Sequence, residues 1–366
     1  MNVKVILLNA FHPDVRIYKE MLYVTNKGYK AEILALDRAN EHIDNKVQYF
    51  DGIKVTHFFP RGKRDVSKYK NFFKKIIYFF WFLRYVFQVK KHLKKEKFEI
   101  LHCSGFYATL VGYLLKKKNT KLVYDMREYY EGQGRTKVSF IIKKLNKFLC
   151  NKVNHIIYVN DLQKKNITNK DKLVFLPNYV EAKFYQDFEK SKSDKLRISY
   201  IGNIRDVKSL KNLLDSCKDN KDIIIGLNGR GSAYKEFKKI SGNYDNLLLT
   251  GAYDGVKEIA QLFKKCDILF CGYDPDVINW RHAIATKFFE AIVTLTPVIV
   301  FDDTLMGEMV KKHDIGFIVK DNTVASFKKT ISKISKKHLI KKIDNLKKIQ
   351  YDYTWEKVVK NLDKIY

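Results

Sequence analysis

Short apolar runs alternate with longer amphipathic segments along the whole chain. Apolar runs bounded by turn residues predict a first series of strands at KVILLNA, KAEILAL, IKVTHFF, EILHCS, KLVYDM and HIIYVN. A second series begins at LRISYIG and continues with DIIIGLNG, NLLLTGAY, DILFCGY, PVIVFD and GFIV. Strands that alternate with helical segments are typical of parallel sheets joined by crossover helices. The pattern predicts an α/β protein with two tandem, Rossmann-like, doubly wound domains.

A polar, irregular stretch over residues 169–195 separates the two series and has the composition of an interdomain linker. The length of 366 residues also fits two domains of about 150–200 residues each. We predict an N-terminal domain over residues 1–180 and a C-terminal domain over residues 181–351. Ligands of doubly wound sheets bind beyond the carboxyl ends of the strands, so the expected site is a cleft to which both domains contribute.

The composition excludes two classes of protein. With 46% hydrophobic and 14% aromatic residues, the chain is not a disordered one. It has five cysteines and no CxxC pair, which argues against a disulfide framework and favours a reducing, cytoplasmic compartment. Met1 leads directly into a predicted strand, so no cleavable signal is expected.

The formal net charge of +30 has two explanations. It reflects either a lysine-rich coding bias or a polyanionic neighbour, which would be nucleic acid or an anionic membrane surface. The longest apolar segment, residues 71–95, bears on this choice. Its uninterrupted part, Ile76 to Leu83, is far shorter than the roughly 20 residues of a spanning helix. Nucleic acid is less favoured, because no recognition motif accompanies the aromatic residues.

Wound as a helix, residues 71–95 place their polar side chains on one narrow stripe, made of Lys74, Tyr78, Tyr85, Gln88, His92 and Lys95. The remaining apolar face is wider than contact with one sheet requires. A helix packed on a sheet explains part of that face, and a helix at an anionic lipid interface explains the excess aromatics and the flanking lysines. The residues expected to face the membrane are Lys74, Lys75, Phe79, Trp81, Phe82 and Arg84.

In the second domain, four strand ends carry glycine, a base or a carboxylate. After the first strand, Gly202 allows close approach of a ligand, and Arg205 and Lys208 accompany the free amides of the next helix start. Two cations beside free amides suit a diphosphate, although ordinary surface charge is the alternative in a chain with 70 basic residues. The next two strand ends carry Gly226, Gly229 and Gly231 around Arg230, and then Gly251 and Tyr253.

The helix predicted in ATKFFEAIV carries Lys287 and Glu290 on one face. A glutamate near a helix start complements the macrodipole, whereas a lysine there opposes it. The lysine is better explained if an anion binds at the helix start.

The strand-end turns of the first domain hold further candidate site residues. His12 and Asp14 lie in the first strand–helix turn, where a solvated turn is an equally good explanation. His102 ends another strand and is best explained as a buried hydrogen-bonding residue. Asp125 and Glu128 end a further strand, and Glu128 is the preferred carboxylate among these turns. Because no His, Asp and Glu cluster shows metal-ligand spacing, no metal ion is expected.

In chain order, these segments resemble the retaining glycosyltransferases of family 4, which have the two-domain GT-B fold, over essentially the whole length. In the first domain the resemblance rests on HPDVRIYKEMLYVTNKGYKAEILAL, EILHCSGFYATLVGYLL, KLVYDMREYY, NKVNHIIYVN and VFLPNYVEAKF. In the second it rests on YIGNIRDVKSLKNLL, DNLLLTGAY, ATKFFEAIVTLTPVIV and the closing YTWEKVVKNLDKIY. The closing segment implies a helix over residues 352–366 that crosses back to the first domain.

The resemblance implies transfer of a sugar, with retention of configuration, from a UDP-sugar rather than a GDP-sugar to a lipid-linked glycan, in the synthesis of a bacterial surface polysaccharide. Arg205 and Lys208 would hold the diphosphate and, with Glu128, act in catalysis. Glu290 would accept hydrogen bonds from the ribose hydroxyls. The implied donor-binding residues are Gly202, Asn203, Arg205, Lys208, Gly229, Gly251, Tyr253, His282, Lys287 and Glu290. The acceptor-side candidates are His12, Asp14, Ser104, Asp125 and Glu128.

The same resemblance implies no metal ion or other cofactor. The implied partners are the nucleotide sugar, the lipid-linked or glycan acceptor and an anionic membrane surface, with no nucleic acid. The expected location is cytoplasmic, peripheral on the inner face of the cell membrane.

The chain departs from the family pattern at several positions. His282 stands where many members carry a second glutamate, and Leu295 stands where a glycine usually precedes TPVI. Ala285 replaces a usual proline, Ser104 and Arg127 replace usual histidines, and NAFHPD replaces a glycine-rich loop. Two alternatives stay open: a sugar-nucleotide epimerase on the same fold, against which the aromatic basic helix speaks, and a non-catalytic glycosyltransferase-like binding partner, which His282 and Leu295 favour.

Overall fold

The computed structural model describes all residues of the chain except 13, 61–70, 128–136, 166, 186–187 and 254. The preferred acceptor-side carboxylate, Glu128, therefore lies outside the described residues.

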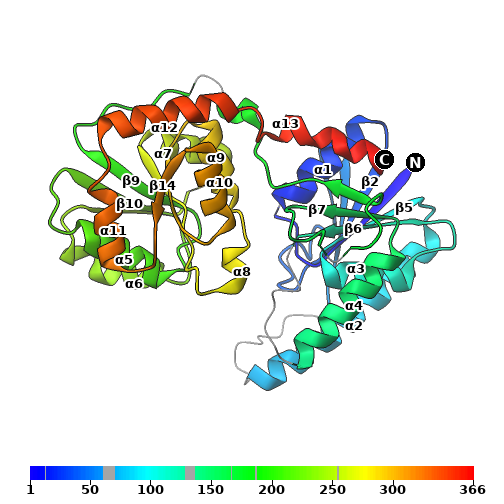
Figure 1. Cartoon of the computed structure of the whole chain (residues 1–366). Coiled ribbons are helices and arrows are strands. Elements are labelled where there is room, and N and C mark those ends of the chain that lie inside the picture. The colour runs from blue at the N-terminus through cyan, green and yellow to red at the C-terminus, as the bar shows by residue number, and fades with distance from the viewer. Residues whose placement is uncertain (13, 61–70, 128–136, 166, 186–187, 254) are drawn as a thin grey trace. The chain divides into compact units, whose positions relative to one another are not determined.

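The chain divides into two compact units, each with its own sheet and covering helices (Figure 1). The first unit consists of residues 1–177 and 359–366, and the second of residues 178–358. The limits expected from the sequence are residues 180 and 351. Both units have the doubly wound α/β architecture that the strand pattern predicts.

The first unit is built on a sheet with the strand order β3-β4-β2-β1-β5-β6-β7-β8. Its strands are β1 (Asn2–Leu7), β2 (Lys30–Leu36), β3 (Val47–Phe50), β4 (Ile53–Phe58), β5 (Ile100–Ser104), β6 (Lys121–Met126), β7 (His155–Tyr158) and β8 (Leu173–Phe175). The edge strand β3 pairs antiparallel with β4 through a turn at Asp51 and Gly52, whose φ angles of 46° and 81° are both positive, as a type I′ hairpin turn requires. The hydrophobic pattern does not reveal β3 or β8.

Helices cover both faces of this sheet. They are α1 (Val15–Asn26), α2 (Asn71–Lys95), α3 (Phe106–Leu115) and α4 (Lys137–Lys152). In Figure 1, α2, α3 and α4 lie on one face, and α1 lies on the other with the returning residues 359–364. Asp14 caps α1, because its carboxylate accepts a hydrogen bond from the Ile17 amide.

Part of the predicted polar stripe of α2 faces the sheet, whereas Tyr78 and Lys95 of this stripe are exposed. Tyr85 is fully buried and donates to the carbonyl of Leu34 at 2.7 Å, and Gln88 donates to the carbonyl of Phe59 at 3.1 Å. The predicted polar stripe therefore packs inward on the sheet at these positions. The exposed apolar side chains of α2 are Ile76, Tyr78, Phe79, Phe80, Leu83 and Phe87.

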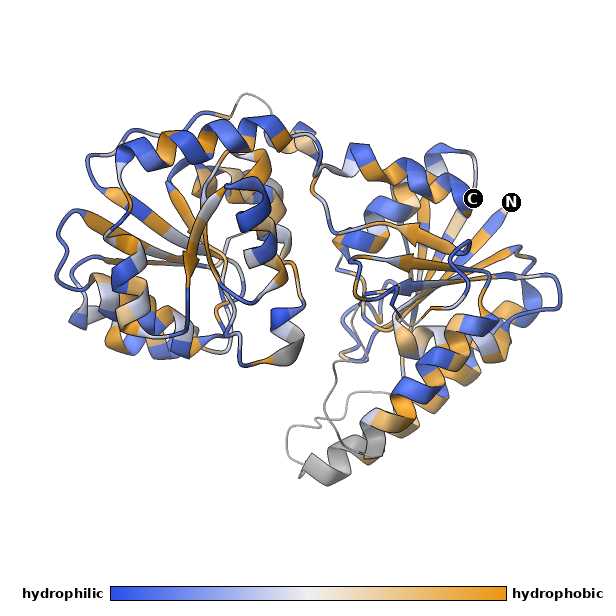
Figure 2. Ribbon diagram, in the orientation of Figure 1, coloured by the Kyte–Doolittle hydropathy of each residue, from blue (hydrophilic) through white to orange (hydrophobic). Residues whose placement is uncertain are grey.

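Two of the residues predicted to face a membrane, Trp81 and Phe82, are half-buried, and Phe82 packs against the core. Phe79 and Arg84 are exposed, whereas the side chains of Lys74 and Lys75 lie outside the described part. Figure 2 shows hydrophobic residues in the strands of both sheets and along the described parts of α2 and α4. Among the described residues, no helix combines the length and the apolarity needed to cross a membrane.

The second unit has a parallel sheet with the strand order β11-β10-β9-β12-β13-β14. Its strands are β9 (Leu196–Ile201), β10 (Ile223–Asn228), β11 (Leu247–Gly251), β12 (Ile268–Phe270), β13 (Val298–Phe301) and β14 (Gly316–Val319). Numbered from β9, this is the 3-2-1-4-5-6 order of dinucleotide-binding folds.

The helices of the second unit are α5 (Val207–Cys217), α6 (Tyr234–Ile240), α7 (Gly255–Lys264), α8 (Ile278–Arg281), α9 (Thr286–Val293), α10 (Leu305–His313), α11 (Val324–Ile331), α12 (Lys336–Ile349) and α13 (Trp355–Val358). α5, α6 and α11 pack on one face of the sheet, where Leu210, Phe237 and Phe327 join the core, and α9 and α12 lie on the other face (Figure 1). After α13, residues 359–366 belong to the first unit, where the Asn361 side chain donates to the carbonyl of Phe175.

Candidate active site

The strand order of the second sheet reverses between β9 and β12. β9 leads through α5 to β10 on one side, and the chain reaches β12 on the other side only after β11. The connections therefore diverge at the carboxyl ends of these two strands, which is where doubly wound sheets bind their ligands. Gly202 directly follows β9, and Cys271 directly follows β12.

The loops after β9 and β10 are joined by backbone hydrogen bonds. The Gly202 amide donates to the carbonyl of Asn228 at 2.9 Å, and the Ile204 amide donates to that of Arg230 at 2.8 Å. Gly229 has φ 137°, and a β-carbon at this position would lie 1.9 Å from the carbonyl oxygen of Gly202. Only glycine permits this approach, which fixes the backbone at the end of β9.

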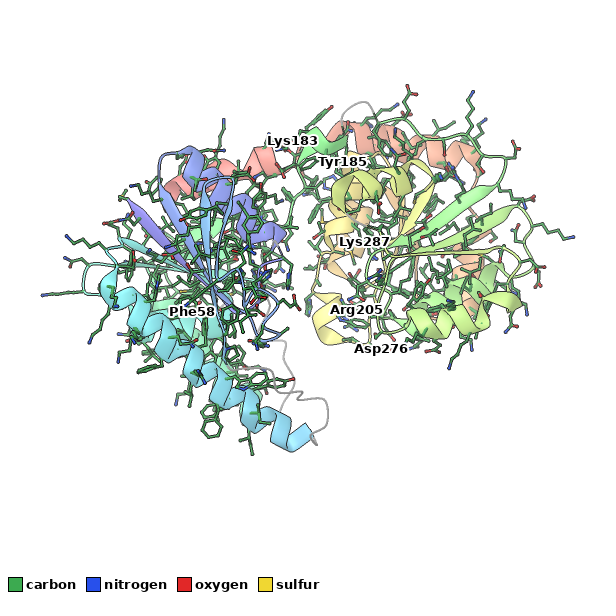
Figure 3. All side chains as sticks on the ribbon, turned by 180° about the vertical axis from the view of Figure 1, so that it is seen from behind. Phe58, Lys183, Tyr185, Arg205, Asp276 and Lys287 are labelled. Carbon is green, nitrogen blue, oxygen red and sulfur yellow. The ribbon has the colours of Figure 1, made fainter. Side chains whose placement is uncertain are left out.

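Lys287, which Figure 3 labels, lies in the first turn of α9, and its Nζ approaches the backbone at Gly202. Its Nζ lies 3.2 Å from the centroid of the Tyr200 ring and 5.6 Å from that of Tyr273. The residue is only 7% exposed, and Nζ has no hydrogen-bond partner within the described part of the chain. Burial lowers the pKa of Lys287 to about 8. A β-carbon at Gly202 would lie 3.9 Å from Nζ, so the ammonium faces the open side of that glycine.

A buried ammonium without an acceptor is unfavourable until an anion binds to it. The start of α9 adds to this preference, because its Ala285 cap offers no side-chain hydrogen bond to the first amides. Free amides, the helix dipole and a cation thus converge at one point. This geometry suits the anion that the sequence pattern predicts beside Lys287.

Glu290 lies one turn further along α9 and is half-buried. Tyr185, the last residue of a 3-10 helix (Ala182–Tyr185), donates a hydrogen bond to its carboxylate. Burial, and then the charge of Glu290, raise the pKa of Tyr185 far above its usual value and that of Tyr253 to about 12. Two tyrosines therefore face one carboxylate. A carboxylate has about four acceptor positions, so Glu290 retains capacity for further donors such as ribose hydroxyls.

Arg205 is exposed, and its guanidinium group lies over two aromatic rings. The central carbon of the group is 5.1 Å from the centroid of Tyr273 and 5.0 Å from that of Trp280. Stacking holds the planar group in place, so little further entropy is lost when its N–H groups bind an anion. Arg205 comes from the loop after β9, and its side chain lies over residues that follow β12. It is therefore well arranged as a second cation beside Lys287.

Lys208 is arranged differently from Lys287. Its side chain is 54% exposed, and its Nζ lies 3.2 Å from carboxylate oxygens of both Asp274 and Asp276. The start of α5 is closed by Asp206, which accepts hydrogen bonds from the amide and hydroxyl of Ser209 and from the Asp274 amide. Lys208 would have to leave two aspartates to meet a diphosphate. Its assignment to the diphosphate stays a prediction, and the start of α9 is the better anion site.

The other predicted donor residues lie around these groups. The exposed Asn203 accepts a hydrogen bond from the Tyr200 hydroxyl through its carbonyl, at 2.7 Å. Gly251 ends β11 and accepts from the Gly229 amide, also at 2.7 Å. His282 is half-buried and forms the C-cap of α8.

In the first unit, buried charges connect α1 with β6. Asp125 is fully buried, and both of its oxygens accept hydrogen bonds from Arg16 at 2.7–3.2 Å. Arg127 donates to Asp125 at 3.1 Å and to both oxygens of Asp14 at 2.8 and 2.9 Å. Burial alone would raise the pKa of Asp125, but the two guanidinium groups outweigh it and hold the pKa well below its usual value. Asp125 is thus a residue that positions Arg127.

The same network extends to Tyr366. The buried carboxylate of Glu20 lies 3.0 Å from Arg16 Nε and 3.3 Å from Nε2 of the fully buried His102. Nδ1 of His102 lies 2.8 Å from the Tyr366 hydroxyl. Burial raises the pKa of Glu20 and lowers that of His102 to about 4. His102 therefore has the buried hydrogen-bonding role expected from the sequence.

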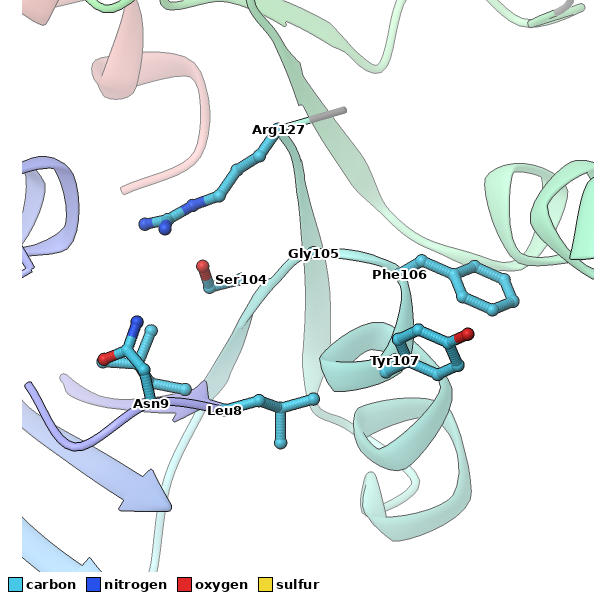
Figure 4. A pocket seen from close by; sticks show the side chains of 8 residues that line it. Leu8, Asn9, Ser104, Gly105, Phe106, Tyr107 and Arg127 are labelled. Carbon is cyan, nitrogen blue, oxygen red and sulfur yellow. The ribbon is translucent and has the colours of Figure 1, made fainter. Parts of the chain in front are cut away.

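A pocket of about 200 Å³ opens at the ends of β1 and β5, where the order of the first sheet reverses. It is lined by Leu7, Leu8, Asn9, Ser104, Gly105, Phe106, Tyr107 and Arg127. Figure 4 shows the polar groups of Asn9, Ser104 and Arg127 on one side and the rings of Phe106 and Tyr107 on the other. Of the acceptor-side candidates, Ser104 therefore lines the pocket, whereas Nε2 of His12 lies 3.0 Å from a carboxylate oxygen of Glu41.

The sequence pattern does not mark several residues that shape the candidate donor site. Tyr200, Tyr273 and Trp280 surround the two cations, and Tyr185 bonds to Glu290. Nothing in their spacing marks them, because aromatic residues make up 14% of the chain. Asp206 could have been recognised, since an aspartate just before an amphipathic run is a helix-cap signal.

Family models match both units. The model described as Glycosyltransferase Family 4 matches residues 17–184, and that described as Glycosyl transferases group 1 matches residues 182–352. Together they span almost the whole chain. The chain belongs to the family 4 glycosyltransferases and has the GT-B fold. Comparison with curated protein sequences gives no match.

Solved structures share this fold at low sequence identity. Sucrose-phosphate synthase from Thermosynechococcus elongatus has a TM-score of 0.77 at 13% identity, with 100% of this chain and 98% of that one covered. Anabaena HepE in complex with UDP-glucose has a TM-score of 0.72 at 12% identity and coverages of 100% and 99%. The lipopolysaccharide outer core galactosyltransferase WaaB has a TM-score of 0.63 at 13% identity, again with coverages of 100% and 99%.

Proposed function

We propose that this glycosyltransferase transfers a sugar, with retention of configuration, from a UDP-sugar to a lipid-linked glycan acceptor in the synthesis of a bacterial surface polysaccharide. The observation that carries the donor half of the proposal is Lys287, a buried ammonium without a hydrogen-bond partner among the described residues, at the start of α9 and facing Gly202. The donor diphosphate supplies the missing anion. The UDP-glucose bound to the structural relative HepE supports the choice of nucleotide.

In this proposal the diphosphate lies between the end of β9 and the start of α9. Lys287, Arg205 and the free amides there meet the negative charge that grows on the leaving diphosphate as the sugar–phosphate bond breaks. Glu290 accepts hydrogen bonds from the ribose hydroxyls, and Tyr185 holds its carboxylate in position. The leaving charge is met by protein groups fixed before the reaction.

The donor site is tested by replacing Glu290 with alanine. We expect the affinity for UDP to fall by about 1–3 kcal/mol, the usual contribution of hydrogen bonds to a charged group. Isothermal titration of UDP, GDP and the corresponding nucleotide sugars measures this loss and ranks the nucleotides.

The matched control is Glu308→Ala, which removes an exposed glutamate from the first turn of α10. Its affinity for UDP should equal that of the unchanged protein. If a folded Glu290→Ala protein binds UDP as tightly as the control does, Glu290 is not in the donor site. Tighter binding of GDP than of UDP would contradict the proposed nucleotide.

For the acceptor, we propose the pocket lined by Ser104, Asn9 and Arg127. Polar groups on one side suit sugar hydroxyls, and the rings of Phe106 and Tyr107 on the other suit the apolar face of a sugar. The anomeric configuration of the product, read by NMR from a reaction with a defined donor, distinguishes retention from inversion.

The lipid part of the acceptor fits the outer surface of α2 and α4, and a peripheral location on the inner face of the cell membrane is part of the proposal. Phe79, Phe80 and Phe87 of α2 are 58%, 62% and 67% exposed, and α3 contacts both helices. The exposed apolar side chains of α4 are Phe140, Ile141, Leu145 and Phe148. The exposed lysines at the end of α2 are Lys90, Lys91, Lys94 and Lys95. Exposed aromatics flanked by cations are typical of a helix at an anionic lipid interface.

We expect the protein to sediment with vesicles that contain anionic lipid and to be only partly released by salt. Each lysine near such a surface contributes about 1 kcal/mol, which salt screens, whereas the contribution of buried rings does not depend on salt. Replacing Phe79, Phe80 and Phe87 with serine should weaken binding by roughly 100-fold or more, because burial of one such ring contributes about 1.5–3 kcal/mol. Vesicle co-sedimentation over a range of salt concentrations measures both effects.

The matched control replaces three exposed apolar residues of the second unit, Leu248, Ile340 and Tyr351, with serine. This variant should bind vesicles as the unchanged protein does. Equal losses in both triple variants, or no binding to anionic vesicles at low salt, would rule out α2 as a membrane-binding surface.

A further inference from the structure

Three of the nine histidines of the chain lie together at one edge of the first sheet. His57 is in β4, His42 is in the loop that follows β2, and His12 is in the loop that follows β1. Asp37 directly follows β2. Because β1, β2 and β4 are parallel, their carboxyl ends bring these side chains to the same edge.

The rings of this cluster lie close enough to share one ion. The centroids of His42 and His57 are 4.2 Å apart, and those of His12 and His42 are 5.4 Å apart. One candidate ligand atom from each of Asp37, His42 and His57 lies within 4.8 Å of the other two, and the same holds for His12, Glu41 and His42. Ligand atoms around a tetrahedral zinc ion, bound at about 2.0–2.2 Å, lie about 3.4 Å apart, so these spacings must contract by at most about 1.4 Å when the ion binds.

The ring nitrogens that would bind the ion have no hydrogen-bond partner within the described residues. These are Nδ1 of the fully buried His57 and Nε2 of His42, and neither atom is in contact with solvent. Buried polar atoms of this kind are normally satisfied, so two of them in one cluster call for an absent ligand. A purely structural stack of rings would leave both unsatisfied.

Gln48 of β3 orients the His57 ring. Its Oε1 lies 3.4 Å from Nε2 of His57, so this nitrogen carries the proton and Nδ1 presents its lone pair.

The Asp37 carboxylate is also held in place, because it accepts hydrogen bonds from the amides of Ala39 and His42. The Nδ1 of His42 faces the Gln48 amide nitrogen at 3.3 Å. If His42 binds the ion through Nε2, the single proton of its ring must lie on Nδ1. The long contact between Nδ1 and the Gln48 amide nitrogen is then lost, because both atoms carry protons.

We propose that Asp37, His42 and His57 bind a transition-metal ion that prefers imidazole ligands, such as Zn²⁺, with His12 and Glu41 at the outer side of the site. Two imidazoles and a carboxylate select against Mg²⁺, which prefers oxygen ligands alone. The ion links the loops that follow β1 and β2 to β4. The proposal is independent of the donor reaction. The sequence does not reveal the site, because its residues have no ligand spacing and only the strand ends bring them together.

Absorption spectroscopy of Co²⁺, a substitute for Zn²⁺, tests the proposal. The full chain, freed of any affinity tag and stripped with a chelator, is titrated with Co²⁺ and followed by visible d–d absorption. We expect one Co²⁺ per chain with the intense absorption of a four-coordinate site, lost on addition of Zn²⁺. Gln48→Leu should weaken binding by about 10–100-fold, as changes next to metal ligands usually do, and His57→Ala should weaken it further.

The control is His338→Ala, which removes an exposed histidine of α12 and should leave the titration unchanged. Circular dichroism checks the fold of each variant, and if His57→Ala does not fold, the half-buried His42 is replaced with alanine instead. The proposal is overturned if the unchanged protein gives no d–d absorption. It is also overturned if a folded His57→Ala or His42→Ala protein binds Co²⁺ as tightly as the control does.

Discussion

Replacing Lys287 with methionine should stabilise the second unit of the free protein and, at the same time, weaken its binding of UDP. The free protein buries this ammonium without a hydrogen-bond acceptor among the described residues. A pKa lowered from 10.5 to about 8 corresponds to about 3 kcal/mol of destabilisation of the charged form. Methionine keeps most of the side-chain volume, so we expect a gain in stability on the order of 2 kcal/mol. Binding of UDP should fall by about 10–100-fold, because a charge-assisted hydrogen bond is lost.

The gain should depend on pH. Since the pKa of Lys287 is lower in the folded than in the unfolded state, its destabilising effect is fully present below about pH 8. As the pH rises from about 8 to the unfolded value of 10.5, the unfolded state binds more protons and the effect disappears. The stability difference between the Lys287→Met variant and the unchanged protein should therefore shrink over this range. Hydrogen exchange of β9 and β13 reports on the second unit alone.

Lys190 provides a matched control. It is also a lysine with a pKa lowered to about 8 by burial, but its Nζ donates to the carbonyls of Phe263 and Cys266 and to the Thr296 hydroxyl. Lys190→Met should therefore destabilise the unit and leave UDP binding unchanged. If Lys287→Met destabilises the unit as Lys190→Met does, Lys287 is a structural lysine. Undiminished affinity for UDP in Lys287→Met would lead to the same conclusion.

Replacing Asp125 with alanine should destabilise the first unit by about 3–5 kcal/mol, the usual cost of removing one partner of a buried ion pair. The reason is that Arg16 would keep its buried position and lose its bidentate acceptor. The pKa of Asp125 is held below its usual value, so its contribution is present above about pH 4 and is lost as the pH falls further. Hydrogen exchange of the amides of β5 and β6 measures the change in the first unit.

Asp161→Ala is the matched control for this change. Asp161 pairs with Lys164 through a side chain that is 77% exposed, and exposed pairs of this kind contribute about 0–1 kcal/mol. Equal exchange rates in the two variants would show that the Arg16–Asp125 pair does not stabilise the unit.

Much of the fold and part of the candidate site can be predicted from the sequence. Strand ends in a parallel sheet share one edge, so residues such as Gly202 and Gly229 can be assigned to one site from their positions in the chain alone. The anion-binding role of Lys287 can likewise be predicted from the sequence, because a lysine at a helix start opposes the helix dipole. What the sequence cannot show is which cations already have partners. Lys208 and Lys287 look alike along the chain, yet only Lys208 is neutralised by two aspartates.

The sequence-based interpretation does not assign the inward face of α2, for a related reason. Polar side chains on an amphipathic helix usually mark its outer face. The Tyr85 hydroxyl and the Gln88 amide nitrogen instead donate hydrogen bonds to the backbone carbonyls of Leu34 and Phe59, so these two donors are satisfied inside. Phe79 and Phe87 then remain outside. A hydropathy pattern shows which residues are polar. It does not show which hydrogen-bond acceptors, such as backbone carbonyls, the tertiary structure places next to them.

The bond between Tyr366 and His102 has a consequence for the order in which the protein is made. Residues 359–366 belong to the first unit, but a ribosome synthesises them after the whole of residues 178–358. At about 5–20 residues per second, the nascent first unit waits roughly 10–40 s for its last segment. During this interval His102 lacks its tyrosine, and the face beside α1 lacks its cover. Moving this segment in front of Met1 by circular permutation would let the first unit complete its fold before the second is synthesised.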